Sequence, residues 1–319
     1  MSRLLSTLRM MQDIGNRPPT RAPEVSKKAL DELEITALDG QVTEFVLDEL
    51  ALPDSHSQEV QQVQVRRKKR RTENLKDFGE NRPINERVIA FHKFDPVAAE
   101  QYRKLYTEIA QVKRTSEIQT LLITSALAGE GKSISALNLA ITSAAHEDKH
   151  DVLLIDTDLR KPVLHNYLGI RPEWGLTDYL LGDVEYSRII CKTQIPRLMI
   201  IAAGRRTSDP TALLASTRME QFVRDIKTQK KYAYIILDTS PVLLTSEPKG
   251  LLQYVDTAIL VVRAKKTPAA VVSQVIKILG EENILGCVLN GVTSSDLPLY
   301  HYSYSATYYH TEPNPSHLT

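Results

Sequence analysis

The sequence has few cysteines and no long apolar run. Only Cys191 and Cys287 occur in 319 residues, nearly a hundred positions apart. This scarcity excludes a disulfide framework and a cysteine-based metal site, and it is typical of a reducing compartment. No apolar run approaches the ~18 residues of a membrane-spanning helix. The first 16 residues also lack the small-residue cleavage site of a signal peptide, so we expect a cytoplasmic protein.

The chain also has almost no net charge. Its 40 basic and 39 acidic residues give a formal charge of +1, so we expect no nucleic-acid partner. A hydrophobic content of 42% and a charged content of 25% are typical of globular proteins. Within residues 1–94, however, the charges are segregated. Acids dominate up to position 59, and six consecutive bases follow at 66–71.

Residues 1–94 have little apolar periodicity, and we expect a mostly flexible arm with a basic segment. The basic run could contact acidic lipid head groups or a partner, or it could be a solvated linker.

From residue 95 short β-branched runs alternate with helical stretches, which predicts one catalytic domain over 95–290. Because most of the runs are continuously apolar, they indicate a doubly wound, mostly parallel sheet between helices, an α/β fold. The expected strands are 120–124, 151–156, 197–202, 233–238, 257–263 and 284–290. The expected helices are 96–114, 133–146, 211–228 and 268–279.

The strongest motif is Ala126-Leu-Ala-Gly-Glu-Gly-Lys-Ser133, between an expected strand and an expected helix. It has phosphate-loop spacing, with alanine in place of the first glycine. Gly129 and Gly131 would let backbone amides close around phosphate oxygens at the positive end of the helix. Lys132 would place a cation on the β- and γ-phosphates, and the Ser133 hydroxyl could bind Mg²⁺. We therefore expect ATP and Mg²⁺ as cofactors.

Three aspartates follow expected strands. Asp156 ends the second strand, Asp158 follows it two residues later, and Asp238 ends the fourth. Ligands of open α/β sheets bind outside the carboxyl ends of the strands, so these side chains should face the phosphates. One of them could hold Mg²⁺, and another could accept a proton from the attacking hydroxyl. A strand-end aspartate can also simply cap the next helix.

Several ordered segments resemble the bacterial tyrosine kinases of exopolysaccharide and capsule biosynthesis, a branch of the deviant-Walker P-loop ATPases. They are GEGKS (129–133), LLIDTDLRKPVLH (153–165), GLTDYLLG (175–182), IILDTSPVL (235–243), ILVVRA (259–264) and ILGCVLN (284–290). The resemblance spans about residues 95–310.

The resemblance implies a P-loop NTPase fold and roles for single residues. Lys132 and Ser133 belong to Walker A, Asp156 and Asp158 to Walker A′, and Asp238 to Walker B. We assign Lys132 and the three aspartates to catalysis, with Asp156 as general base, and Ser133, Asp158 and Asp238 to Mg²⁺. The nucleotide contacts are then expected at Gly129, Glu130, Gly131, Lys132, Ser133 and Ile134, with Arg263 and Asn290 near the ribose and adenine.

The resemblance also implies partners. The family is activated by a membrane protein of the polysaccharide co-polymerase type, and a separate, membrane-spanning activator is expected here. This partner would hold the kinase at the inner face of the plasma membrane. The family assembles rings through an E-x-x-R-x-x-R helix. Glu100 and Arg103 match that pattern, but Tyr106 replaces the second arginine. Ala128 and Ser240 likewise replace prolines of the family motifs.

Residues 291–319 form the expected tyrosine-rich tail. Five of the thirteen tyrosines fall within ten positions, interleaved with Ser, His and Thr and without any Lys or Arg. An aromatic edge strand or a sticky tail is the alternative to a substrate segment. The resemblance implies that the tail is the autophosphorylation substrate. The expected sites are Tyr300, Tyr302, Tyr304, Tyr308 and Tyr309.

Two other functions are consistent with the motifs. One is a nucleotide-switch ATPase of the septum-site and partition type, and the other is a pseudokinase scaffold. The switch ATPases carry a signature lysine at the position of Leu127, which argues against the first. The three intact aspartates argue against the second.

Overall fold

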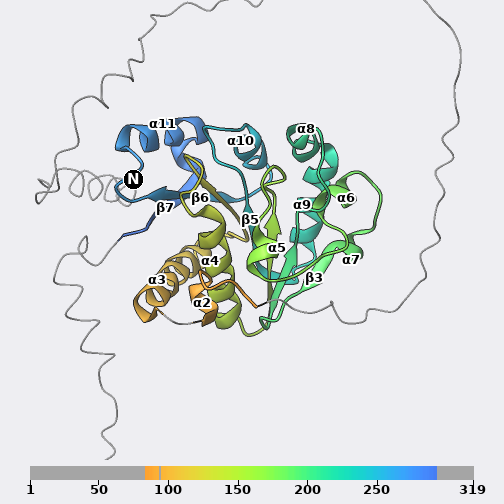
Figure 1. The fold of residues 1–319 in the computed structure, drawn as a ribbon, viewed down its shortest axis with the longest axis horizontal. Coiled ribbons are helices and arrows are strands. Elements are labelled where there is room, and N and C mark those ends of the chain that lie inside the picture. The colour runs from red at the N-terminus through yellow and green to blue at the C-terminus, as the bar shows by residue number, and fades with distance from the viewer. Residues whose placement is uncertain (1–82, 93–94, 293–319) are drawn as a thin grey trace, which may run out of the picture. The chain divides into compact units, whose positions relative to one another are not determined.

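The computed structural model describes residues 83–92 and 95–292, which contain one seven-stranded sheet with helices on both faces (Figure 1). The strand order is β3-β4-β2-β5-β1-β6-β7. Neighbouring strands are parallel, except for the antiparallel β3–β4 pair at one edge. The expected mostly parallel α/β sheet is therefore confirmed. The strands are β1 (Thr120–Ser125), β2 (Asp151–Asp156), β3 (Ile190–Lys192), β4 (Leu198–Ile201), β5 (Tyr232–Asp238), β6 (Thr257–Arg263) and β7 (Ile284–Asn290).

The helices form two layers because alternate side chains of each strand point to opposite faces of the sheet. In β1, Leu121 and Ile123 face one layer, whereas Leu122 faces the other. The first layer contains α2 (Ile89–His92), α3 (Pro96–Lys113), α4 (Lys132–His146) and α5 (Leu164–Tyr167). The second contains α6 (Leu176–Leu180), α7 (Tyr186–Ile189), α8 (Pro210–Leu214), α9 (Thr217–Thr228), α10 (Glu247–Leu251) and α11 (Ala269–Leu279), and the short helix η2 (Glu281–Asn283) precedes β7.

One predicted helix is wrong. Residues 211–228 form two helices, α8 and α9, rather than one. Ser216 separates them, because its extended backbone and its hydroxyl, which accepts a hydrogen bond from the Met219 amide at 3.2 Å, begin a new helix.

The chain before α3 also contributes to the core. Ile84 and Val88 are buried with residues of α4, although they lie in the segment expected to be a flexible arm. The Ala90 amide donates to Asn138 Oδ1 at 2.8 Å and ties α2 to α4. The rest of the expected arm, residues 1–82 and 93–94, and the tail from residue 293 lie outside the described residues.

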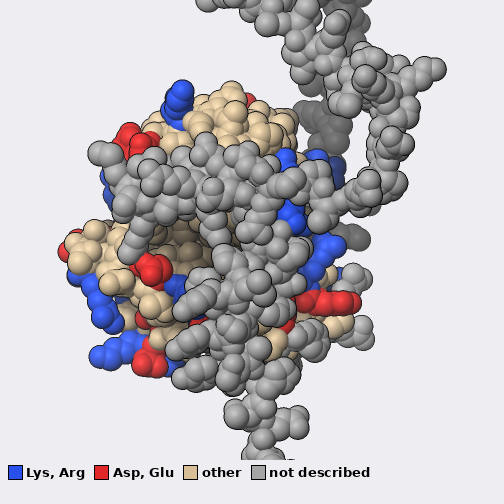
Figure 2. Space-filling model, turned by 90° about the vertical axis from the view of Figure 1, so that its left-hand side faces the viewer, with Lys and Arg blue, Asp and Glu red and all other residues tan. Residues whose placement is uncertain are grey.

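Figure 2 shows the side of the molecule on which α3, α11 and β7 lie in Figure 1. Where described residues are visible there, both basic and acidic side chains are scattered among uncharged ones. None of the helices within 83–92 and 95–292 is long and apolar enough to span a lipid bilayer.

Candidate nucleotide site

The phosphate loop connects β1 to α4 and requires glycine at two positions. Gly129 and Gly131 have φ angles of 80° and 95°, in the left-handed region that other residues rarely adopt. A Cβ atom on Gly131 would also lie 2.0 Å from Nδ2 of Asn290. Gly131 directly precedes the 15-residue helix α4, whose first amides therefore open toward the loop. Ile134 lies in the first turn of this helix.

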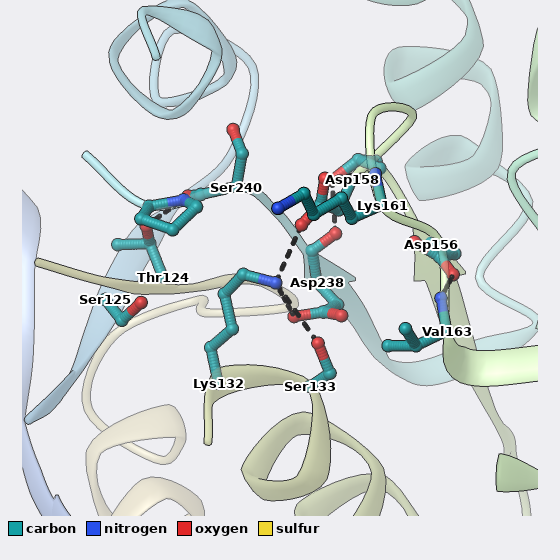
Figure 3. Close-up of polar contacts among 12 residues, drawn as sticks. Thr124, Ser125, Lys132, Ser133, Asp156, Asp158, Lys161, Val163, Asp238 and Ser240 are labelled. Carbon is teal, nitrogen blue, oxygen red and sulfur yellow. Dashed lines mark hydrogen bonds and ion pairs between the residues drawn. The ribbon is translucent and has the colours of Figure 1, made fainter. Parts of the chain in front are cut away.

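Lys132 lies among the carboxylates that end two neighbouring strands (Figure 3). Its Nζ is 2.8 Å from Oδ2 of Asp158 and 3.9 Å from Oδ1 of Asp238. The Ser133 hydroxyl lies 3.2 Å from the same Nζ. The parallel pairing of β2 with β5, in which Asp156 is opposite Asp238, brings the strand ends together. The residues that the sequence assigned to Walker A, A′ and B thus form one cluster.

Backbone amides hold the two Walker A′ carboxylates. Oδ2 of Asp156 accepts from the amides of Val163 and Leu164 at 3.1 and 3.2 Å. Oδ1 of Asp158 accepts from the Lys161 amide at 3.1 Å. The loop after β2 therefore folds back over its own strand end and fixes the direction of both side chains.

The side chains of this cluster are almost fully buried, and their burial shifts the pKa values of titratable groups within it. Burial raises the pKa of the Asp238 carboxyl to about 6, although Lys132 and the Ser133 hydroxyl lower it. Burial and the charge of Asp238 raise the pKa of Asp156 well above its usual value. For Lys132, burial lowers the pKa, but the carboxylates of Asp238 and Asp158 outweigh it, and the net pKa is raised. Lys132 therefore stays a cation at neutral pH.

The donor set fits a nucleotide-bound magnesium ion. Both carboxylate oxygens of Asp238 and Oδ1 of Asp156 are buried and receive no well-aligned hydrogen bond from the described residues. A cation or its water would supply such partners. In the described part of the chain no group of three or more His, Cys, Asp or Glu side chains could form a protein-only metal site. Mg²⁺ usually takes one or two protein ligands and completes its shell with phosphate and water.

Glu130, Arg263 and Asn290 lie together on the other side of the loop. Arg263 and Asn290 are register partners at the carboxyl ends of β6 and β7. Asn290 Nδ2 donates to the Glu130 carbonyl at 2.8 Å, and the Arg263 guanidinium lies against Gly291. The Glu130 side chain is buried and accepts from the Leu127 amide and from the Thr267 hydroxyl. Thr267 was not predicted as a site residue, because the sequence around it carries no motif.

A second polar network lies at the end of the Walker A′ segment, and it too was missed. Arg160 contacts Oε1 of the buried Glu247 at 2.8 Å and donates to the Thr211 hydroxyl at 3.1 Å. It thereby joins this segment to α8 and α10. A cavity of about 590 Å³ follows along the chain and is lined by residues that include His165, Trp174 and Arg205.

The remaining predicted site residues lie away from this cluster or outside the described residues. Glu100 and Arg103 are on α3 and pair with each other at 2.6 Å. Tyr106 turns inward: its hydroxyl donates to Glu147 at 3.3 Å, and its ring lies 5.0 Å from that of His146. The five tail tyrosines all lie beyond residue 292.

Comparisons with known proteins agree with this arrangement. A family model described as an AAA domain matches residues 118–283, just over half of the chain. Tyrosine-protein kinase YwqD of Bacillus subtilis (strain 168) is 31% identical over 217 residues, which cover 67% of this chain and 90% of YwqD. Tyrosine-protein kinase ptk of Acinetobacter johnsonii is 31% identical over 180 residues, which cover 56% of this chain and 24% of ptk.

A solved structure extends the similarity to three dimensions. The kinase domain of Escherichia coli tyrosine kinase ETK is 30% identical to this chain and has a TM-score of 0.62. The match covers 69% of this chain and 86% of that domain.

Proposed function

The chain belongs to the bacterial tyrosine-protein kinases with an AAA domain, and we propose that it transfers the γ-phosphoryl group of ATP to tyrosines of its own C-terminal tail. The observation that carries this proposal is the position of Lys132 between Asp158 and Asp238 beside the phosphate loop. The tyrosine-kinase relatives favour transfer to tyrosine over the nucleotide-switch alternative.

In the proposed mechanism the loop binds the phosphates. The backbone amides from Gly129 to Ile134, with the positive end of α4, would surround the β- and γ-phosphates. Lys132 would exchange its ion pair with Asp158 for one with the γ-phosphate. There it would stabilise the charge that develops in the transition state. Mg²⁺, bound by Ser133 with Asp238 or Asp158, would neutralise phosphate charge and orient the γ-phosphoryl group.

Asp156 is the proposed general base. The phenol of tyrosine has a pKa of about 10 and needs a proton acceptor at neutral pH. The raised pKa of Asp156 makes its carboxylate a stronger base than an exposed aspartate. The Val163 and Leu164 amides hold Oδ2, whereas Oδ1 has no donor among the residues that the structure describes. In this role Oδ1 would take the phenolic proton as the tyrosine oxygen bonds to phosphorus and the bond to ADP breaks.

Arg263 and Asn290 are the proposed contacts to the ribose and adenine. They end the two strands on the far side of the loop from the carboxylates. A nucleotide whose phosphates lie on the loop could extend its base in that direction.

The proposed partners are a second copy of the chain and a membrane-spanning activator. Glu100 and Arg103 are partly exposed on α3, where they could exchange their mutual ion pair for pairs with a neighbour. Because the matched region is only 24% of ptk, this kinase region occurs with additional chain in at least one relative. We propose that an activator of the polysaccharide co-polymerase type supplies such a part in trans and holds the kinase at the inner face of the plasma membrane.

The test is phosphotyrosine formation by the full chain. Purified protein is incubated with ATP and Mg²⁺, with and without a cytoplasmic fragment of a candidate activator. We expect weak phosphorylation of the chain alone and stronger phosphorylation with the fragment. Lys132→Met should abolish both while leaving the circular dichroism spectrum unchanged, because it removes the cation on the phosphates.

Lys192→Met is the matched control, since Lys192 is exposed on the edge strand β3. This variant should retain wild-type phosphotyrosine. Wild-type levels of phosphotyrosine in Lys132→Met would instead overturn the proposed site.

A further inference from the structure

Glu130 places a carboxylate in a loop that is expected to bind phosphate. It lies in the phosphate loop one residue before Gly131, so an exposed side chain would place negative charge beside the phosphates. The structure turns this side chain inward, and only 3% of the residue is exposed. The carboxylate therefore has a role other than direct contact with the nucleotide.

The inward carboxylate joins two segments that are far apart in the sequence. Its Oε2 accepts from the Leu127 amide at 2.7 Å, within the loop. Its Oε1 accepts from the Thr267 hydroxyl, in the connection between β6 and α11, and from the amide of Arg263, the last residue of β6, at 3.4 Å. One buried side chain thus bonds to both segments.

Backbone hydrogen bonds hold the connection between β6 and α11 in place. The Ala264 amide donates to the Asn290 carbonyl at 2.9 Å, and the Thr267 amide donates to the Arg263 carbonyl at 3.0 Å. Thr267 is buried, with 7% of the residue exposed. On the backbone side of the loop, Asn290 Nδ2 donates to the Glu130 carbonyl at 2.8 Å. The loop is therefore held against the ends of β6 and β7 at both its side chain and its backbone.

We propose that Glu130 and Thr267 are positioning residues that hold the phosphate loop in its nucleotide-binding shape by tying it to the β6–α11 connection. Without the Glu130–Thr267 hydrogen bond, the loop would have to be ordered by the nucleotide itself. Part of the binding free energy would then be used for ordering, and affinity for nucleotide would fall. The inference rests on the proposed nucleotide site, but not on transfer to tyrosine.

The test changes Thr267, which lies outside the loop. Thr267→Val removes the hydroxyl and keeps the shape of the side chain, whereas Thr267→Ser keeps the hydroxyl. We expect Thr267→Val to raise the Kd for Mg-ATP about tenfold, the effect of losing one hydrogen bond to a charged group. Calorimetry on the full chain measures this constant, and the KM for ATP should rise with a smaller change in kcat. Thr267→Ser should bind ATP as the wild type does.

Thr193→Val is the matched control for a purely structural effect. Its hydroxyl donates to the Leu198 carbonyl at 2.9 Å near the β3–β4 edge, so it should lower the Tm without changing the Kd for ATP. A Thr267→Val variant with a lowered Tm and a wild-type Kd would overturn the inference.

Glu130 is tested in the same way. In Glu130→Gln the amide can donate to the Thr267 hydroxyl while its oxygen still accepts from Leu127, so affinity should fall less than in Glu130→Ala. Equal Kd values in the wild type, Glu130→Ala and Thr267→Val would contradict the proposal. Wild-type protein that binds ATP but forms no phosphotyrosine would instead overturn the proposed function and leave this inference standing.

Discussion

Asp238 ends β5 with no exposure to solvent, and burial raises the pKa of its carboxyl to about 6 from an ordinary value of 3.8. Between about pH 4 and pH 6 the folded protein therefore keeps a proton that the unfolded chain has released. The free energy of unfolding falls as the pH rises through this window. Above pH 6 the buried Asp238 charge lowers the free energy of unfolding by about 3 kcal/mol at most.

We accordingly expect Asp238→Asn to be more stable than the wild type at pH 7.5 in the absence of nucleotide and Mg²⁺, and to lack kinase activity. The advantage should shrink as the pH falls toward 4.5, where the wild-type carboxyl binds its proton. The Tm of both proteins across this pH range measures the difference. An Asp238→Asn variant that is less stable at pH 7.5 would show that the ion pair with Lys132 outweighs the cost of burial.

Single residues also show what the sequence could and could not predict. The motif spacing and the rule that ligands bind at the carboxyl ends of parallel strands were enough to bring Lys132, Asp156, Asp158 and Asp238 together. Glu130 was predicted as a nucleotide contact from its place in the motif, but its side chain points to Thr267, 137 residues further along the chain. No local pattern predicts a contact of that kind.

At the scale of elements, the length of a helix or strand largely decides whether the sequence predicts it. The strands β2, β6 and β7 have the bounds that the apolar runs predict. The short elements α5, α6, α7, α10 and β3 were not predicted, because three to five residues are too few to show a periodicity. Their positions depend on tertiary contacts, such as the two amides near the start of α5 that bond to Asp156.

The packing of α3 changes the interpretation of Tyr106. The resemblance placed it in a row of residues used for ring assembly, yet its ring lies against His146 and 6.2 Å from the ring of Tyr234. Tyr106 thus helps to attach α3 to α4 and β5. Its partly buried ring packs against the core, where an arginine would have to bury part of its charge or turn outward.

We expect Tyr106→Ala to lower the free energy of unfolding by about 2 kcal/mol, because it removes a partly buried ring. Tyr106→Phe keeps the ring and loses one hydrogen bond to Glu147, so it should cost only about 0.5 kcal/mol. Urea unfolding of the three proteins measures both values. Equal stability of the alanine variant and the wild type would mean that the ring does not hold α3 in place.

At the scale of the whole molecule, the proposed reaction occurs between copies of the chain. Exposed ion pairs contribute only about 0–1 kcal/mol each, so a contact through Glu100 and Arg103 alone would be weak. Each phosphate added to the tail brings a charge of about −1.5 to −2, and several together would repel one another. We therefore expect the unmodified protein to associate and the phosphorylated protein to be a monomer.

A mixing experiment tests transfer between chains. A Lys132→Met chain is combined with an active chain whose five tail tyrosines are replaced by phenylalanine, and size-exclusion chromatography follows association. Phosphate should appear on the tail of the Lys132→Met chain. If that tail stays unmodified, while wild-type protein modifies itself at a rate independent of concentration, the reaction occurs within one chain.

The most direct test of the central claim is to map phosphotyrosine by mass spectrometry after incubation of the wild-type chain with ATP and Mg²⁺, together with the activator fragment. We predict phosphate on tyrosines among Tyr300, Tyr302, Tyr304, Tyr308 and Tyr309, and none after Lys132→Met. A chain that hydrolyses ATP under the same conditions and carries no phosphate on any tail tyrosine would contradict the account.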